Sequence, residues 1–113
     1  MKKLEAIIRH YKLDDVRHAL LKAGVQGMTI TEVRGWGHEK PCAETYRGVD
    51  HDVAYVSRVK VEVVVDEDQA APAIDAILAA AYTGRHGDGR IFVMNLENIV
   101  RIRTGEQQVL ALS

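Results

Sequence analysis

The first third of the chain switches from the apolar spacing of a strand to that of a helix. Leu4 to Ile8 form a short, mostly apolar run that is typical of a strand. Apolar residues then recur every three or four positions from Leu13 to Ala23, which predicts an amphipathic helix. Asp14 and Asp15 suit the positive N-terminal end of this helix, and Gly24 suits a left-handed cap at its C-terminal end.

A long segment without periodicity follows the second predicted strand. The β-branched residues between Met28 and Val33 predict that strand. From Gly35 to about Ser57 neither spacing is kept, and glycines, a proline and charged residues are scattered through the segment. A structureless stretch of about twenty residues is uncommon in a small domain and is usually functional. We therefore expect a functional loop at this place in the chain.

Strict alternation returns after the loop. Valines at 59, 61, 63 and 65 alternate with Lys60 and Glu62, which predicts a third strand. Asp66 and Gln69 have the spacing of a helix-capping pair. Pro72 removes a backbone hydrogen bond, so we expect the second helix to start late or to tighten in its first turn. The apolar positions of this helix lie at helical spacing: Ile74, Ile77, Leu78 and Ala81.

Two further strands are predicted near the C-terminus, at Ile91 to Met94 and at Val100 to Arg103. The order is thus β-α-β, a long loop, then β-α-β and a short extension. This order predicts an α+β fold of the ferredoxin-like split βαβ type (βαββαβ), with the long loop between its second and third strands. We expect a single domain over residues 1–113, with the loop at about 37–57 and a tail at 105–113.

Composition narrows the class of protein. Of the 113 residues, 47% are hydrophobic and 27% are charged, as in an ordinary globular domain. The net charge of −1 argues against a nucleic-acid binder, which needs many phosphate-neutralising cations. A single cysteine, Cys42, excludes an internal disulfide, and no apolar run approaches the length that spans a bilayer. We expect a cytoplasmic protein without direct membrane insertion.

A glycine-rich turn joins the second helix to the strand at 91–94. Residues 83–90 read TGRHGDGR, with three glycines in six positions. Consecutive N–H groups in such a turn form an anion-binding nest, and Arg85 and Arg90 add positive charge. A plain surface turn is the alternative, and the Walker pattern of an ordinary P-loop is absent. The turn is therefore a candidate site for phosphate groups.

Arg101 and Arg103 are the second candidate for anion binding. Residues two apart on a strand share one face, and guanidinium groups bind phosphate oxygens in bidentate fashion. Two solvated arginines on an edge strand are the alternative. Together with the glycine-rich turn, the pair favours a pocket for a polyphosphate.

Several segments resemble the PII family of signal-transduction proteins, without gaps from Met1 to about Glu106. The resemblance implies a ferredoxin-like homotrimer that is not an enzyme. It also implies three clefts between subunits that bind ATP or ADP, and a T-loop that docks onto a target transporter or enzyme, commonly an ammonium channel. The matching segments are TGRHGDGRIFV (83–93), VRIRTGE (100–106), residues 1–8, KLDDVR (12–17), GMTITEVRGWG (27–37) and ETYRG (44–48).

The resemblance also implies the roles of individual residues. Thr29, Glu62 and Val64 would hold the adenine base, the latter two largely through their backbones. The T-loop root would approach the nucleotide, and the glycine-rich turn would cradle the phosphates. Arg101 and Arg103 would come from a neighbouring subunit. The residues of the root and the turn are Gly37, His38, Gly87, Asp88, Gly89 and Arg90.

The T-loop departs from the family pattern. The family's glutamine, which helps to hold Mg²⁺ with ATP and 2-oxoglutarate, is Glu39 here, and the lysine that pairs with the 2-oxoglutarate carboxylate is Arg58. His51 occupies the position of the tyrosine that proteobacterial members modify. Nucleotide binding is therefore expected to be kept, and 2-oxoglutarate sensing is expected to be weakened.

Three alternatives stay open at this point. The chain is expected to regulate nitrogen metabolism, but a divergent PII-like sensor for inorganic-carbon uptake or metal efflux has the same motifs. A slow ATPase is a second alternative. A metal site in the loop is a third, since His38, Cys42 and His51 are plausible ligands for zinc, copper or nickel, although their spacing matches no established site.

Overall fold

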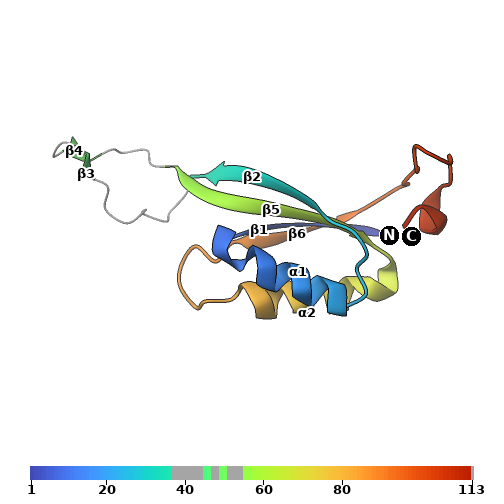
Figure 1. Ribbon diagram of the computed structural model, residues 1–113, viewed down its shortest axis with the longest axis horizontal. Coiled ribbons are helices and arrows are strands. Elements are labelled where there is room, and N and C mark those ends of the chain that lie inside the picture. The colour runs from blue at the N-terminus through green and yellow to red at the C-terminus, as the bar shows by residue number, and fades with distance from the viewer. Residues whose placement is uncertain (37–44, 47–48, 51–54, 113) are drawn as a thin grey trace.

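The computed structural model describes residues 1–36, 45–46, 49–50 and 55–112. Figure 1 shows its strands and helices. Two single-turn 3₁₀ helices, His10–Lys12 and Gln108–Leu112, accompany the main elements. The other elements are β1 (Lys2–Ile8), α1 (Leu13–Lys22), β2 (Thr29–Gly35), β3 (Thr45–Tyr46), β4 (Val49–Asp50), β5 (Val56–Val65), α2 (Glu67–Ala81) and β6 (Arg90–Asn95).

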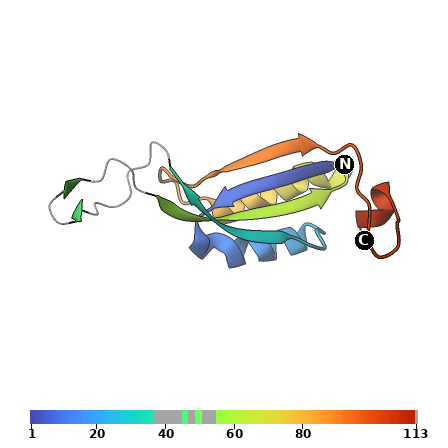
Figure 2. The ribbon, with the colours of Figure 1, turned by 90° about the horizontal axis from the view of Figure 1, so that it is seen from above.

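The main sheet has four antiparallel strands in the order β2-β5-β1-β6. Both helices cover one face of this sheet and leave the other face open (Figures 1 and 2). Order and layering are those of the ferredoxin-like α+β fold, so the predicted βαββαβ arrangement is confirmed. β3 and β4 pair only with each other, as two-residue strands.

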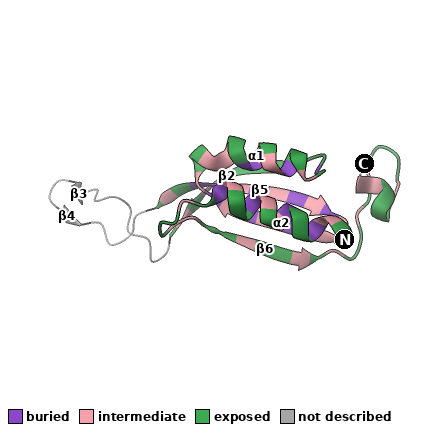
Figure 3. Ribbon diagram, turned by 90° about the horizontal axis from the view of Figure 1, so that it is seen from below, coloured by how far each residue is buried: buried purple, intermediate pink, exposed green. Residues whose placement is uncertain are grey.

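The core lies between the sheet and the two helices. Every second residue of β5 from Val59 to Val65 is buried, as are Leu4, Ala6 and Ile8 of β1. The helices contribute one stripe each, and Figure 3 shows these buried stripes in purple. Because strand side chains alternate between faces, Lys3, Glu5, Arg58 and Glu62 fall on the open face. The stripes consist of Val16 and Leu20 in α1 and of Ala70, Ala73, Ile77 and Ala81 in α2.

Caps define the helix ends much as expected. Gly24 adopts a φ of 89°, and the N–H groups of Gly24 and Val25 donate to the carbonyls of Leu21 and Leu20 at 3.1 and 3.0 Å. This is the Schellman pattern, in which a left-handed residue satisfies the last carbonyls of a helix. At the start of α2, Asp66 and Gln69 form the expected capping box.

Two expectations for α2 are wrong. The helix begins at Glu67, well before Pro72, since the capping box sets its start. Pro72 has no N–H to donate to the carbonyl of Asp68. Both residues are exposed, so water can donate to this carbonyl instead, at little cost in free energy. Leu78 belongs to the predicted apolar stripe, but its side chain is 56% exposed beside the edge strand β6. Neither α1 nor α2 is long and apolar enough to cross a bilayer.

The strand predicted at Val100 to Arg103 does not form. Val100 makes only an isolated bridge with Gln107, and residues 102–104 form a turn. The Arg101 N–H donates to the Glu106 carbonyl at 2.8 Å, and the Gly105 N–H donates to the Arg101 carbonyl at 2.8 Å. A strand needs a neighbouring strand to pair with, and in one described chain this segment meets only its own continuation.

Candidate functional site

The turn between α2 and β6, residues 83–89, is organised around one carboxylate and is called the glycine loop below. Asp88 Oδ2 accepts from the backbone N–H groups of Thr83 and Gly84 at 2.8 and 2.9 Å. Its Oδ1 accepts from the Thr83 hydroxyl. The Thr83 hydroxyl and amide, followed by the Gly84 amide and Arg9, hold the pKa of Asp88 well below its ordinary value. The carboxylate is therefore charged and occupied by its own loop.

Arg9, which follows β1, contacts the same loop from outside. Its Nε donates to Asp88 Oδ1 at 3.2 Å, and its Nη2 donates to the His86 carbonyl at 2.8 Å. Two residues further on, the Tyr11 hydroxyl accepts from Arg85 at 3.0 Å. Arg85 is thus held toward the 3₁₀ turn before α1. The glycine loop, which lies late in the sequence, is thus contacted by residues close to the N-terminus.

Gly89 shows why this loop requires glycine. Its φ is 101°, and a Cβ added at this position would lie 1.7 Å from the Ile7 carbonyl oxygen. Gly87 also adopts the left-handed region, with a φ of 96°. An L-residue side chain is strained in that region, and at Gly89 it would also overlap the backbone of β1. At Gly89, the backbone of the loop therefore lies directly against the backbone of β1.

An open cleft of about 550 Å³ lies between the glycine loop and the ends of β2 and β5. It is called the loop cleft below. It brings four of the predicted site residues together, Gly87, Gly89, Arg90 and Arg58, with Trp36 and His86 beside them. Arg58 is buried and donates to the Ser57 carbonyl at 3.1 Å. Asp88 does not line this cleft, because its carboxylate faces the loop's own amides. The cleft therefore combines backbone of the glycine loop with two guanidinium groups.

The three residues predicted to hold a base lie together at the other end of the sheet. Thr29 pairs with Glu62 across β2 and β5, and Val64 joins them in a hollow of about 480 Å³, called the strand hollow below. The Glu62 carboxylate pairs with Lys3 at 2.8 Å, which lowers its pKa from the ordinary value. Among the described residues, β2 starts opposite Glu62, so Val64 pairs with β1 on one side only.

Arg101 and Arg103 are not brought to the glycine loop within one chain. The segment that carries them, residues 100–112, is called the C-terminal tail below and lies at the end of the sheet opposite to the glycine loop (Figures 1 and 2). Arg101 pairs with Glu106 at 2.8 Å, and Arg103 is exposed in the turn. The single chain thus presents the predicted cations and the predicted phosphate loop on separate surfaces.

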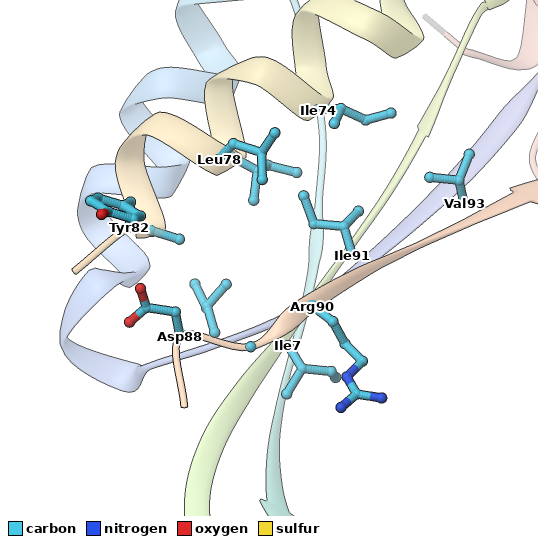
Figure 4. A pocket seen from close by; sticks show the side chains of 12 residues that line it. Ile7, Ile74, Leu78, Tyr82, Asp88, Arg90, Ile91 and Val93 are labelled. Carbon is cyan, nitrogen blue, oxygen red and sulfur yellow. The ribbon is translucent and has the colours of Figure 1, made fainter. Parts of the chain in front are cut away.

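A third hollow, between α2 and β6, is mainly apolar and has a volume of about 340 Å³. Figure 4 shows Ile74 and Leu78 of α2 facing Ile91 of β6, while the guanidinium of Arg90 is directed away from them. The positive charge of Arg90 therefore serves the loop cleft rather than this hollow. No polar ligand site is indicated between α2 and β6.

The remaining predicted residues lie outside the described part of the chain: Gly37, His38, Glu39, Cys42 and His51. Their roles toward nucleotide, effector or metal stay predictions. Within residues 1–36 and 55–112, no three His, Cys, Asp or Glu side chains are grouped closely enough to hold a metal ion.

The sequence reasoning missed two residues that hold the glycine loop, Arg9 and Tyr11. No spacing rule indicates them, because Arg9 and Asp88 are 79 positions apart. The sequence predicts both the strand at Leu4 to Ile8 and the turn at 83–90, but their closeness follows only from the pairing of β1 with β6. Chain topology was the missing information.

Comparison with known proteins assigns the family. The family model described as nitrogen regulatory protein P-II matches residues 1–106. A nitrogen regulatory protein P-II from Nostoc punctiforme is 51% identical over 99% of this chain and 100% of its own length. One from Bradyrhizobium diazoefficiens is 52% identical with the same coverage, and nitrogen regulatory protein P-II 1 from Escherichia coli is 47% identical, also with that coverage. Fold, motifs and relatives agree: the chain belongs to the nitrogen regulatory protein P-II family.

Proposed function

We propose that this protein is a non-enzymatic regulator of nitrogen metabolism that binds ATP or ADP between copies of itself. Through the segment at 37–57 it controls a target transporter or enzyme. The names of its relatives support the role in nitrogen regulation. The proposal that a nucleotide binds rests mainly on one observation. The loop cleft combines the backbone of the glycine loop with Arg58 and Arg90.

This combination suits a polyphosphate. ATP and ADP carry several negative charges, which backbone N–H groups and guanidinium groups stabilise together. The Asp88 carboxylate does not line the cleft, and its negative charge is paired with the guanidinium of Arg9. ATP would be accompanied by Mg²⁺, and the residue placed to ligate it by the family resemblance is Glu39.

The loop cleft and the strand hollow are best explained as two halves of one shared site. Arg58 lines the loop cleft and Val64 lines the strand hollow, and six residues of extended β5 separate them by about 20 Å. The tail arginines lie near the strand hollow's end of the sheet (Figure 1). If the loop cleft of one copy meets the strand hollow and tail of the next, base and phosphates are held by different copies. Such head-to-tail contacts close into rings, and the family resemblance makes the ring a trimer.

Slow ATP hydrolysis is not supported as the function. A general base beside the phosphates must be free to accept a proton, and Asp88 is the one carboxylate of the glycine loop. Its lowered pKa and its bonds to the loop make it a weak base. We expect turnover well below roughly 1 s⁻¹, the low end of ordinary enzymes.

The proposal is tested by titrating ATP and ADP into the protein in a calorimeter. Arg103→Ala should weaken both nucleotides by about 1.5–3 kcal/mol, the contribution of a charge-assisted hydrogen bond. Lys22→Ala, which removes an exposed charge on α1, is the matched control and should bind like the wild type. Light scattering should show a trimer. A monomer, or equal affinities for Arg103→Ala and the wild type, contradicts the shared site.

A further inference from the structure

Arg9 makes contacts that the stability of the hydrophobic core does not require. It follows β1 at the edge of the glycine loop, and its side chain is only 13% exposed. Two of its donor atoms reach different parts of the loop: Nε contacts Asp88 Oδ1 at 3.2 Å and Nη2 contacts the His86 carbonyl at 2.8 Å. Arg9 does not line the loop cleft. Both of these contacts are made to the loop itself, outside the cleft.

We propose that Arg9 is a positioning residue that holds the glycine loop in the conformation that receives phosphate groups. The proposal rests on the nucleotide site proposed above. A planar guanidinium donates along fixed directions, so the two contacts fix the position of the Asp88 carboxylate relative to the His86 carbonyl. Lysine has one ammonium on a flexible stem and lacks this fork.

The contact with the His86 carbonyl has a consequence for the next amide. In a planar trans peptide the C=O and the following N–H point in opposite directions. When the His86 carbonyl is turned toward Arg9, the Gly87 N–H is turned away from Arg9. His86 and Gly87 both line the loop cleft, so this peptide group borders the space that a phosphate would occupy. Arg9 thereby orients a phosphate donor without touching the ligand.

The contact with Asp88 acts on the other side of the loop. Asp88 already binds the amides of Thr83 and Gly84, and the Nε of Arg9 fixes the carboxylate from the β1 side. Without Arg9, the Asp88 carboxylate loses its contact from the β1 side and the His86 carbonyl loses its donor, so mainly bonds within the loop hold its shape. We therefore expect loss of order at residues 83–87 rather than unfolding of the domain.

The first test uses hydrogen exchange in nucleotide-free protein. In Arg9→Met, exchange of the amides of residues 83–87 should be faster by about tenfold, the effect of losing one charge-assisted bond. Exchange in β5 should stay unchanged. Tyr11→Phe, which removes only the hydroxyl that accepts from Arg85, is the milder comparison and should change exchange near Arg85 alone. Unchanged exchange of residues 83–87 in Arg9→Met overturns the proposal.

The second test separates positioning from general destabilisation. Arg9→Met should lower ATP affinity about tenfold, whereas adenosine, which lacks phosphates, should bind with wild-type affinity in competition experiments. Arg9→Lys should restore only part of the ATP affinity. An equal loss for ATP and adenosine, or full recovery in Arg9→Lys, overturns the positioning role. If wild-type protein binds no nucleotide, the proposed function fails, while hydrogen exchange still decides whether Arg9 orders the loop.

Discussion

The glycine loop and the C-terminal tail are both candidate phosphate contacts, yet the chain treats them differently. The loop is held by its own chain: Asp88, Arg9 and the close approach of Gly89 to Ile7 determine its shape. In the tail, Ile102 is fully exposed, as are most of the side chains of Val109 and Leu110. An apolar side chain left in water gives up the burial energy that an ordered contact would supply.

The difference indicates where each region obtains its structure. The glycine loop is complete in one copy and is expected to keep its shape when copies separate. The tail exposes apolar side chains and the side chain of Arg103, which is the pattern of a segment that meets another surface. One half of the proposed nucleotide site is thus preformed, and the other half depends on assembly.

The largest effect on the free energy of unfolding should come from replacing Gly89 of the glycine loop. Gly89→Ala places a Cβ against the Ile7 carbonyl in a left-handed backbone, so we expect the free energy of unfolding to fall by at least about 3 kcal/mol. Gly105→Ala is the matched change in the tail: its φ is 73°, but nothing lies within 4 Å of the added atom. It should cost about 1–2 kcal/mol, the strain alone. Urea unfolding measures both, and equal losses would contradict a loop determined by backbone contact.

A medium effect is expected from the charge of Asp88. Asp88→Asn turns an amide NH₂ toward donors, so unfolding should become easier by about 2 kcal/mol at neutral pH. Because folding lowers the pKa of Asp88, the folded state binds fewer protons than the unfolded state. The stability that the carboxylate provides is therefore present above its unfolded pKa of about 3.9 and is lost as the pH falls below it.

The difference between wild type and Asp88→Asn should accordingly shrink from pH 6 toward pH 3. Thermal unfolding of both proteins across this range measures the trend. A difference that stays constant with pH would mean that the carboxylate charge does not hold the loop.

The smallest effect on folding should come from the tip of the tail. Ile102→Ser changes a side chain that is fully exposed in the single chain, so the free energy of unfolding of separated copies should change by less than about 0.5 kcal/mol. Assembly should nevertheless weaken, since the tail is expected to meet another copy. Light scattering over a dilution series measures this. If neither unfolding nor assembly changes, Ile102 is not part of a contact between copies.

Local rules predicted those parts of the fold whose causes lie within a few residues. The alternation in β5, the capping box at Asp66 and the left-handed Gly24 are all short-range features, and the structure confirms them. The prediction from Pro72 was wrong because the capping box stabilises the start of α2 by more than one lost backbone hydrogen bond costs. The alternation at Val100 to Arg103 misled because a strand pattern does not supply a partner strand.

The candidate site was predictable only in its parts. The glycines of the loop are visible in the sequence, because left-handed turns need them. The role of Asp88 as the loop's anchor, and that of Arg9 behind it, arise where β1 passes β6. Contacts between residues so far apart depend on topology, which spacing along the chain does not reveal.

The pairing of Gly35 with Val56 has a consequence for how this protein changes over evolutionary time. These residues end the β2–β5 ladder, so the two ends of the twenty-residue segment between them are already neighbours. Closing a longer segment across such a junction costs only about 0.6 kcal/mol for each doubling of its length. The length of this segment can therefore change for a new partner at little cost in folding free energy, while the sheet beneath it stays as it is.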